Sequence, residues 1–197
     1  DQLYISTDCP TIKKFSKKYN PKIITRPKRI QNPNTLTEDV LQHAHEEIKK
    51  DVGGIDNIKY YILLYANGAF LNSSLIKKAV KKLDNDKKFD SCVGVINADM
   101  FTPIRAKTID KKKGIKPFIP LNKFKKINSN RDSAGNAYFM DLSLQILRPK
   151  CLEKMNGNQK PFLWLGNKIL PFEKEFGGDI DANWQFTILE KWLKKNF

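Results

Sequence analysis

Strand-like and helix-like segments alternate along this chain, and this alternation restricts the fold more than any other feature. Short apolar runs predict strands, and amphipathic patterns predict the helices between them. The predicted strands cover residues 3–7, 22–25, 60–65, 90–95, 137–140 and 168–171, and the predicted helices begin near residues 10, 37, 73 and 184. Such alternation is typical of a three-layer αβα domain, Rossmann-like in class, with a mixed sheet that is largely parallel. The run at 60–65 is apolar enough that we expect it in the centre of the sheet.

Residues 103–135 interrupt this pattern. They are rich in Lys, Pro and Asn and show little hydrophobic periodicity. A long irregular segment inside a compact domain is usually an insertion with a role of its own. We therefore expect residues 1–197 to form a single domain from which residues 103–135 project as an arm.

The charge of the chain limits the classes of partner. It carries 36 Lys and Arg against 21 Asp and Glu, a net charge of +15. A polyanion, either a nucleic acid or a nucleotide triphosphate, could explain this excess. The lysines are scattered in pairs over the predicted helices rather than gathered in one stripe, which favours a solvated surface and no nucleic-acid partner. No apolar run reaches the length of a membrane span, so no membrane partner is expected either.

The cysteines indicate a reducing compartment. The three residues Cys9, Cys92 and Cys151 are far apart, and no two of them form a Cys-x-x-Cys pair. This spacing predicts neither a structural zinc site nor a disulfide framework. We therefore expect a cytoplasmic protein.

Two aspartates near the C-terminus are the candidate metal ligands. Asp179 and Asp181 follow Gly177-Gly178, and alternate positions place both carboxylates on one side of an extended segment. Neighbouring carboxylates favour a hard cation such as Mg²⁺, which can also contact phosphate oxygens. The alternative is that one of the aspartates caps the helix that follows. The Asp-x-Asp pattern by itself favours the cap, and the family likeness given below favours the metal.

The segment Tyr65 to Leu71 follows the most apolar predicted strand. Ligands of open α/β sheets bind beyond the carboxyl ends of the strands, so Asn67 and Gly68 are candidate nucleotide-binding residues. Asn67 could bond a base or sugar, and Gly68 would allow the backbone to come close. An ordinary turn between a strand and a helix explains the segment equally well.

A third candidate group lies at the end of the arm. Arg131 could bind a substrate carboxylate through two parallel hydrogen bonds, beside the glycine turn and the start of a strand. The alternative is a surface ion pair with Asp132. The candidate substrate-binding residues are Arg131, Gly135, Asn136 and Tyr138.

Five segments, in this order, resemble elements of the acylneuraminate cytidylyltransferase family. They are "LYISTD" ending at Asp8, the Arg26-Pro27 turn, the His43-Ala44 helix position, "DSCVGVI" from Asp90 and "DIDANWQF" from Asp179. The resemblance covers nearly the whole chain. Its specificity lies in the order and spacing of the segments rather than in any one motif.

The resemblance implies both a fold and an activity. The fold would be a nucleotide-diphospho-sugar transferase-like domain, and the enzyme would use CTP to activate a nonulosonic acid, releasing pyrophosphate and a CMP-sugar. By the same resemblance Asp179 and Asp181 hold Mg²⁺. Residues 103–135 would join two copies in a homodimer and complete the partner's sugar site. No residue is assigned as the catalytic base.

The identity of the sugar acid stays open, because one segment departs from the sialic-acid members. Those members carry "LQPTSPLR" where this chain has "LYANGAFL", so Tyr65 replaces Gln and Leu71 replaces Arg. The segment is closer to the pseudaminic-acid branch, as is "SAGNAYF" from Ser133. A sialic-, pseudaminic- or legionaminic-like acid is therefore expected.

The family also opens with a strand and a loop of Gly, Ser and Lys that surrounds the triphosphate, and this sequence contains no such loop. Phosphate groups need backbone amides and a cation, so we expect the natural protein to begin with roughly 30 to 40 further residues, enough for a strand, a loop and a helix. Two alternatives remain: a non-catalytic binding or scaffold homologue that lacks the loop, and a metal-dependent glycosyltransferase of similar fold.

Overall fold

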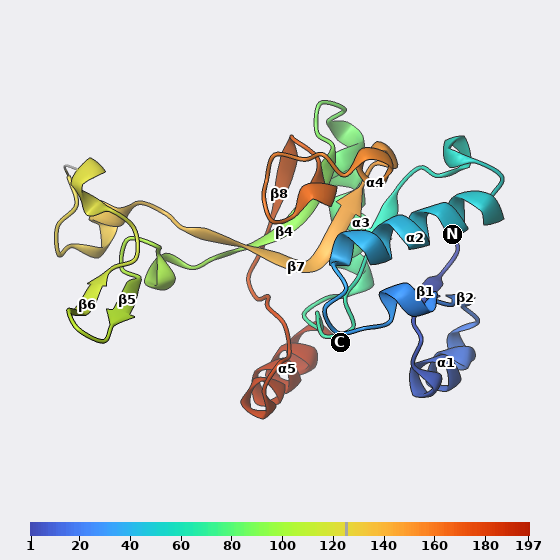
Figure 1. Cartoon of the computed structure of the whole chain (residues 1–197), viewed down its shortest axis with the longest axis horizontal. Helices are drawn as coiled ribbons and strands as arrows, with labels where there is room; N and C mark the ends of the chain where they lie inside the picture. Colours follow the sequence, from blue (N-terminus) through green and yellow to red (C-terminus); the bar gives the residue numbers. More distant parts are fainter. Residues whose placement is uncertain (125) are drawn as a thin grey trace. The chain divides into compact units, whose positions relative to one another are not determined.

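The computed structural model describes residues 1–124 and 126–197, except for the side chains of Met100, Lys123 and Arg131. The helices are α1 (Pro10–Ser16), α2 (Thr37–Asp51), α3 (Ser73–Asn85), α4 (Lys150–Lys154) and α5 (Asn183–Asn196). The strands are β1 (Tyr4–Ser6), β2 (Lys22–Ile24), β3 (Tyr61–Leu63), β4 (Ser91–Asn97), β5 (Lys107–Asp110), β6 (Gly114–Pro117), β7 (Tyr138–Leu147) and β8 (Ile169–Lys174). The mixed α/β fold predicted from the alternation is confirmed (Figure 1). Helix α4 and residues 141–147 of β7 were not predicted.

The chain forms two compact units. The first comprises Asp1–Ile62, Lys82–Cys92 and Ile146–Leu170, and the second comprises Leu63–Lys81, Val93–Gln145 and Pro171–Phe197. None of the helices in the described residues has the length and apolar character that a membrane crossing requires.

Strands β3, β7, β4 and β8 form a four-stranded sheet in that order. The Arg148 amide donates to the Asp90 carbonyl where β4 begins and β7 ends, and the Ala98 amide donates to the Ala137 carbonyl at the opposite ends. β4 and β7 therefore run antiparallel. The Asp90 amide donates to the Lys168 carbonyl just before β4 and β8, so these two strands start together and run parallel. The sheet is mixed, as the sequence predicts.

β3 lies at the edge of this sheet, so the prediction of a central strand is wrong. Within the sheet, β3 has a neighbouring strand, β7, on one side only. Ile62 and Leu64, which share one face of this segment, are also 43% and 45% exposed, so that face is not buried as a central strand would require. An apolar run predicts a strand, but it does not reveal how many neighbours the strand will have.

In the first unit, β1 and β2 pair in parallel, with Tyr4 opposite Lys22 and Ser6 opposite Ile24. Arg26 follows β2 and donates from Nε to Ser6 Oγ over 3.1 Å and from Nη2 to the Ser6 carbonyl over 2.9 Å. The Arg26 side chain therefore holds the turn after β2 against β1.

His45 of α2 is the buried histidine of the first unit. It is 1% exposed, and its Nδ1 lies 2.9 Å from the hydroxyl oxygen of Tyr61. Its Nε2 has no hydrogen-bond partner in the described residues. Burial lowers the pKa of His45, with smaller and opposing effects from nearby charges that include Glu46 and Lys49. The imidazole is therefore held in its neutral form.

We expect acid to destabilise the protein through His45. Above the unfolded pKa of about 6.5 both states are neutral and the stability is complete, and as the pH falls below that value only the unfolded state gains the proton. The free energy of unfolding should fall between pH 7 and pH 5.5 by up to about 1.4 kcal/mol per unit. Urea unfolding at each pH measures this slope. The slope should shrink in His45→Gln, and an equal slope in both proteins would contradict this role.

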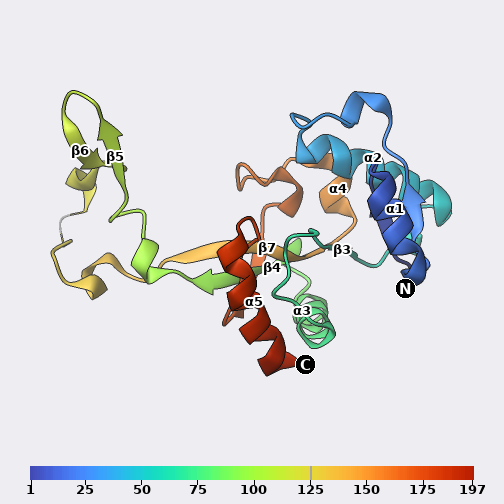
Figure 2. The ribbon, with the colours of Figure 1, turned by 90° about the horizontal axis from the view of Figure 1, so that it is seen from below.

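Residues 103–135 belong to the second unit and contain a hairpin. β5 and β6 pair antiparallel, with Ile109 opposite Ile115, and the chain enters the hairpin from β4 and leaves it towards β7 (Figures 1 and 2). In the turn, Asp110 Oδ1 accepts from the amides of Lys112 and Lys113 over 2.9 Å each, and Gly114 has a φ of 72°. The carboxylate and the glycine explain how this Lys-rich segment makes a tight turn.

Candidate functional site

Residues 177–181, which we call the acidic loop, connect β8 to α5 in the second unit. Gln185, in the first turn of α5, accepts at Oε1 from the amides of Asp181 and Ala182 over 2.6 Å each, and its Nε2 donates to the Asp179 carbonyl over 2.8 Å. The N-cap residue of α5 is Ala182. Gln185 therefore ties the residues that precede α5 to its first turn, and neither aspartate carboxylate makes a cap hydrogen bond to the helix.

Asn67 anchors the far end of the acidic loop. Its Nδ2 donates to Asp181 Oδ1 over 3.1 Å, and its carbonyl accepts from the Ile180 amide over 2.9 Å. The structure thus brings a predicted nucleotide-binding residue next to a predicted metal ligand. No local pattern in the sequence indicates this contact, because the two residues are 114 positions apart.

Gly68 packs against β7. A Cβ atom on Gly68 would lie 2.5 Å from the Cβ and 2.7 Å from the Cα of Ser143, so a larger residue does not fit. This close approach explains the glycine without a ligand, and its nucleotide-binding role stays a prediction.

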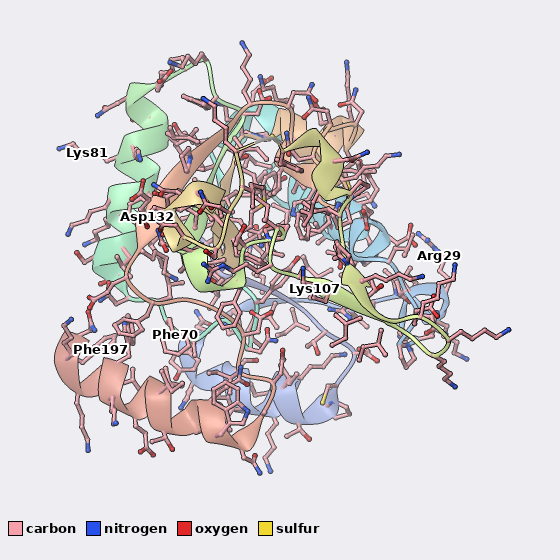
Figure 3. All side chains as sticks on the ribbon, turned by 90° about the vertical axis from the view of Figure 1, so that its left-hand side faces the viewer. Arg29, Phe70, Lys81, Lys107, Asp132 and Phe197 are labelled. Carbon is pink, nitrogen blue, oxygen red and sulfur yellow. The ribbon has the colours of Figure 1, made fainter. Side chains whose placement is uncertain are left out.

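The same segment also supports helix α5. Phe70 stacks edge-to-face on Trp192 with the ring centres 5.9 Å apart, and Trp192 stacks on Phe197 at 6.2 Å. Figure 3 labels Phe70 and Phe197 on the side of the molecule where α5 lies. Residues 65–71 therefore hold both the acidic loop and the helix that follows it.

The acidic loop has the electrostatics of a cation site. Asp179 is half-buried, and its carboxylate accepts no hydrogen bond from the described residues. Burial raises the pKa of Asp179, and the negative charges of Asp181 and Asp141 raise that pKa further. A divalent cation between the two loop carboxylates would relieve this repulsion.

The donor set fits Mg²⁺ bound together with a ligand. Across residues 1–124 and 126–197, no three or more His, Cys, Asp or Glu side chains are arranged to hold a metal ion. A cation held by two carboxylates needs further oxygen atoms from water or phosphate. Mg²⁺ suits such a site, because it is usually bound by one or two carboxylates together with substrate phosphates and water.

A buried polar cluster of Asp141, Ser143 and Lys174 adjoins the acidic loop, and these residues were not among the predicted site residues. The side chains of Asp141 and Lys174 form an ion pair and are 0% and 2% exposed. Ser143 Oγ donates to Asp141 Oδ2 over 2.9 Å and accepts from Lys174 Nζ over 2.9 Å. Asp and Lys are rarely buried so fully unless they are paired.

The predicted substrate-binding residues lie at the root of the arm. Arg131 begins a 3-10 turn that ends at Ala134, and its side chain lies outside the described residues. Gly135 has a φ of 69°, Asn136 is exposed, and Tyr138 is 47% exposed at the start of β7. No hydrogen bond among the described residues joins Gly135, Asn136 or Tyr138 to the acidic loop. Their substrate-binding role stays a prediction.

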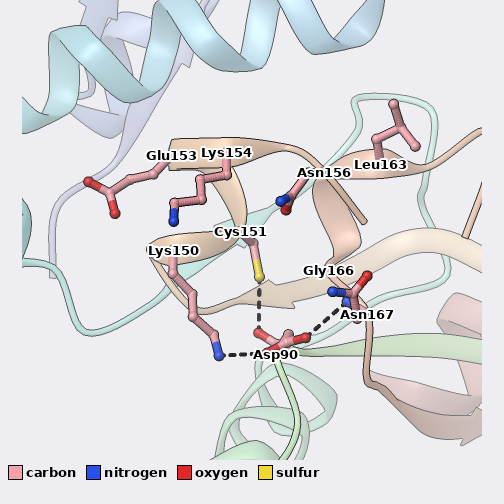
Figure 4. Close-up of a pocket in the computed structure, with 9 residues that line it drawn as sticks. All are labelled: Asp90, Lys150, Cys151, Glu153, Lys154, Asn156, Leu163, Gly166 and Asn167. Atoms are coloured by element: carbon pink, nitrogen blue, oxygen red, sulfur yellow. Dashed lines mark hydrogen bonds and ion pairs between the residues drawn. The ribbon is translucent and has the colours of Figure 1, made fainter. Parts of the chain in front are cut away.

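The first unit contains a separate pocket of about 270 Å³, and none of the predicted site residues lines it (Figure 4). The Asp90 carboxylate in this pocket forms an ion pair with Lys150 Nζ at 2.6 Å. It also accepts hydrogen bonds from the amides of Asn167 and Lys168 over 2.9 and 3.0 Å. Burial acts to raise the pKa of Asp90, but these hydrogen bonds outweigh it and lower the pKa below its ordinary value. Asp90 therefore ties the segment before β8 to the start of β4.

The fold is that of nucleotidyltransferase-like proteins of the Rossmann type. A solved structure of a CMP:2-keto-3-deoxy-manno-octonic acid synthetase complexed with CTP is similar to the chain, with a TM-score of 0.61 and 14% identity, over 100% of this chain and 82% of that one. A protein described as a glucose-1-phosphate thymidylyltransferase from Bacillus anthracis, in complex with sucrose, is also similar. Its TM-score is 0.52 at 13% identity, over 95% of this chain and 74% of that one. No protein-family model and no curated protein matches the sequence.

Proposed function

We propose that this protein is a cytidylyltransferase that activates a nonulosonic acid with CTP and releases pyrophosphate. The observation that carries the proposal is the acidic loop. Its two carboxylates have no capping role, and Asn67 holds Asp181 in place on a nucleotidyltransferase-like fold. We also propose a cytoplasmic location, because the three cysteines are widely spaced and form no Cys-x-x-Cys pair.

In this proposal Asp179 and Asp181 hold Mg²⁺ against the phosphates of CTP. Bound Mg²⁺ would supply positive charge to neutralise the charge that develops on the phosphates. The chain's own residues would hold the two carboxylates in place. The Asn67 carbonyl accepts from the Ile180 amide between them, and Gln185 bonds the carbonyl of Asp179 and the amide of Asp181. The anomeric hydroxyl of the sugar acid would attack the α-phosphate, and pyrophosphate would leave.

Binding of CTP gives the first test. By calorimetry CTP should bind more tightly with Mg²⁺ than without it, because the two carboxylates repel a nucleotide that carries no cation. Asp179→Asn should remove most of this Mg²⁺ dependence, whereas Glu190→Gln on α5 should keep it. Absence of CTP binding by the full-length protein at millimolar concentration, with or without Mg²⁺, would contradict the proposal.

The arm offers a surface for a second copy of the chain. Ile109 and Ile115 face each other across the β5–β6 hairpin and are 87% and 72% exposed. Phe101 and Phe118 at its base are 68% and 64% exposed. Exposed apolar side chains that gather in one region often mark a contact with another protein. We propose that they pack against the partner's arm in a two-fold homodimer.

We expect light scattering of the full-length protein to give twice the mass of one chain. Ile109→Asp combined with Ile115→Asp should produce monomers, because it places carboxylates in an apolar contact. Thr108 pairs with Lys116 on the opposite face of the hairpin from the two isoleucines. Thr108→Asp should therefore leave the dimer intact. A monomeric wild type at micromolar concentration would contradict this prediction.

A further inference from the structure

Asp141 and Lys174 meet across an intervening strand. Asp141 lies on β7 and Lys174 on β8, and β4 runs between them in the sheet. Gly94 of β4 makes room for the contact, because a Cβ atom there would lie 2.9 Å from the Asp141 carbonyl and 3.3 Å from Lys174 Cδ. The missing side chain at Gly94 therefore lets the ion pair form across β4.

Stability alone does not explain such a pair. Two charges lose their hydration on burial, and well-packed apolar residues of similar volume often hold a core equally well or better. The arrangement instead concentrates four hydrogen-bond donors on Asp141. They are the Ser143 amide, Ser143 Oγ, Lys174 Nζ and the Gly178 amide.

The last of these donors belongs to the acidic loop. The Gly178 amide donates to Asp141 Oδ1 over 3.3 Å, and Gly178 directly precedes Asp179. A Cβ atom on Gly177 would lie 2.6 Å from Asp141 Oδ2, so the loop backbone rests directly on this carboxylate. Asn67 holds the other end of the loop through Ile180 and Asp181. Asp179 thus lies between two fixed points of the backbone, and Asn67 holds the carboxylate of Asp181 directly.

We propose that Asp141, held by Lys174 and Ser143, is a positioning residue for the cation site at Asp179 and Asp181. It fixes the loop backbone before any ligand arrives, so that both carboxylates face one cation without further ordering. Lys174 balances the charge of Asp141. The identity of the cation and nucleotide rests on the proposed function, whereas the ordering of the loop is a property of the chain alone.

Two paired variants separate the hydrogen bond from the charge. Asp141→Leu with Lys174→Met removes both the charges and the oxygen that accepts from Gly178, and it replaces each side chain with one of similar size. Asp141→Asn with Lys174→Met removes the charges but keeps an oxygen that accepts from Gly178. The asparagine amide can donate to Ser143 Oγ, which no longer receives a hydrogen bond from Lys174. Circular dichroism and thermal unfolding establish that each variant is folded.

Amide hydrogen exchange without metal and Mn²⁺ binding by electron paramagnetic resonance are then compared with the wild type. In the Leu/Met pair, residues 177–181 should exchange about 10-fold faster or more, and the Kd for Mn²⁺ should rise by roughly 10- to 100-fold. The Asn/Met pair should restore both. Wild-type exchange and affinity in the folded Leu/Met pair would overturn the inference, as would failure of the Asn/Met pair to restore them. A wild type that binds no Mn²⁺ would contradict the proposed function, and the exchange comparison would still decide the positioning role.

Discussion

Asp181→Asn is expected to lower pyrophosphate release by roughly 100-fold while the protein remains folded. The amide keeps the shape of the side chain and keeps an oxygen that can accept from Asn67 Nδ2, but it removes the charge that would hold Mg²⁺. The assay follows pyrophosphate released from CTP and a nonulosonic acid across a Mg²⁺ titration. More Mg²⁺ should be needed to reach half of whatever activity remains.

Glu190→Gln is the matched control, because it removes one carboxylate from the exposed face of α5, away from the acidic loop. Its activity should equal that of the wild type. If Asp181 were only a helix cap, asparagine would replace it well, since Asn and Asp cap helices about equally. Wild-type turnover in Asp181→Asn with an unchanged Mg²⁺ dependence would therefore remove the metal role.

Lys174→Met is expected to destabilise the protein by about 3–5 kcal/mol, because it leaves the Asp141 carboxylate buried without its cation. Asp141 has 0% of its side chain exposed, so water cannot replace the ammonium group. Chemical unfolding of the single variant measures the loss of free energy. The paired variant Asp141→Asn with Lys174→Met should recover much of it, because no unpaired charge remains.

Lys81→Met provides the reference for a lysine without such a role. Lys81 is exposed on α3 and points away from the helix into solvent (Figure 3). Its replacement should change the free energy of unfolding by no more than about 0.5 kcal/mol. A Lys174→Met variant as stable as Lys81→Met would contradict the buried ion pair.

The elements of this fold could be predicted from the sequence because each depends on a local pattern. The helix at 37–51 follows from hydrophobic periodicity, and the strand at 91–97 follows from the short apolar run predicted at 90–95. The place of a strand in the sheet depends on distant residues, and the apolar run at β3 therefore misled the prediction of a central strand. In β7 the polar residues alternate with apolar ones, which usually indicates a face in water. Here that polar face is buried, with Asp141, Ser143 and Gln145 at 2%, 0% and 0% exposure.

The candidate site likewise has a part that the sequence predicts and a part that depends on contacts between distant residues. The Asp179 and Asp181 pair was visible because its two carboxylates are neighbours in the sequence. The contact between Asn67 and Asp181 spans 114 positions, and the pairing of Lys174 with Asp141 spans 33. Neither leaves a local pattern, so only the folded structure shows which lysine, of the many in this basic chain, is buried against a carboxylate.

Formation of a CMP-sugar is the most direct measure of the central claim. The full-length protein is incubated with CTP, Mg²⁺ and a panel of sialic-, pseudaminic- and legionaminic-type acids, and pyrophosphate and the sugar nucleotide are both quantified. The account predicts equal amounts of the two products with at least one acid, loss of both on chelation of Mg²⁺, and far less product when another nucleotide triphosphate replaces CTP. Release of no pyrophosphate with any of these acids, by a folded full-length protein that binds CTP, would contradict the account and favour a non-catalytic binding protein.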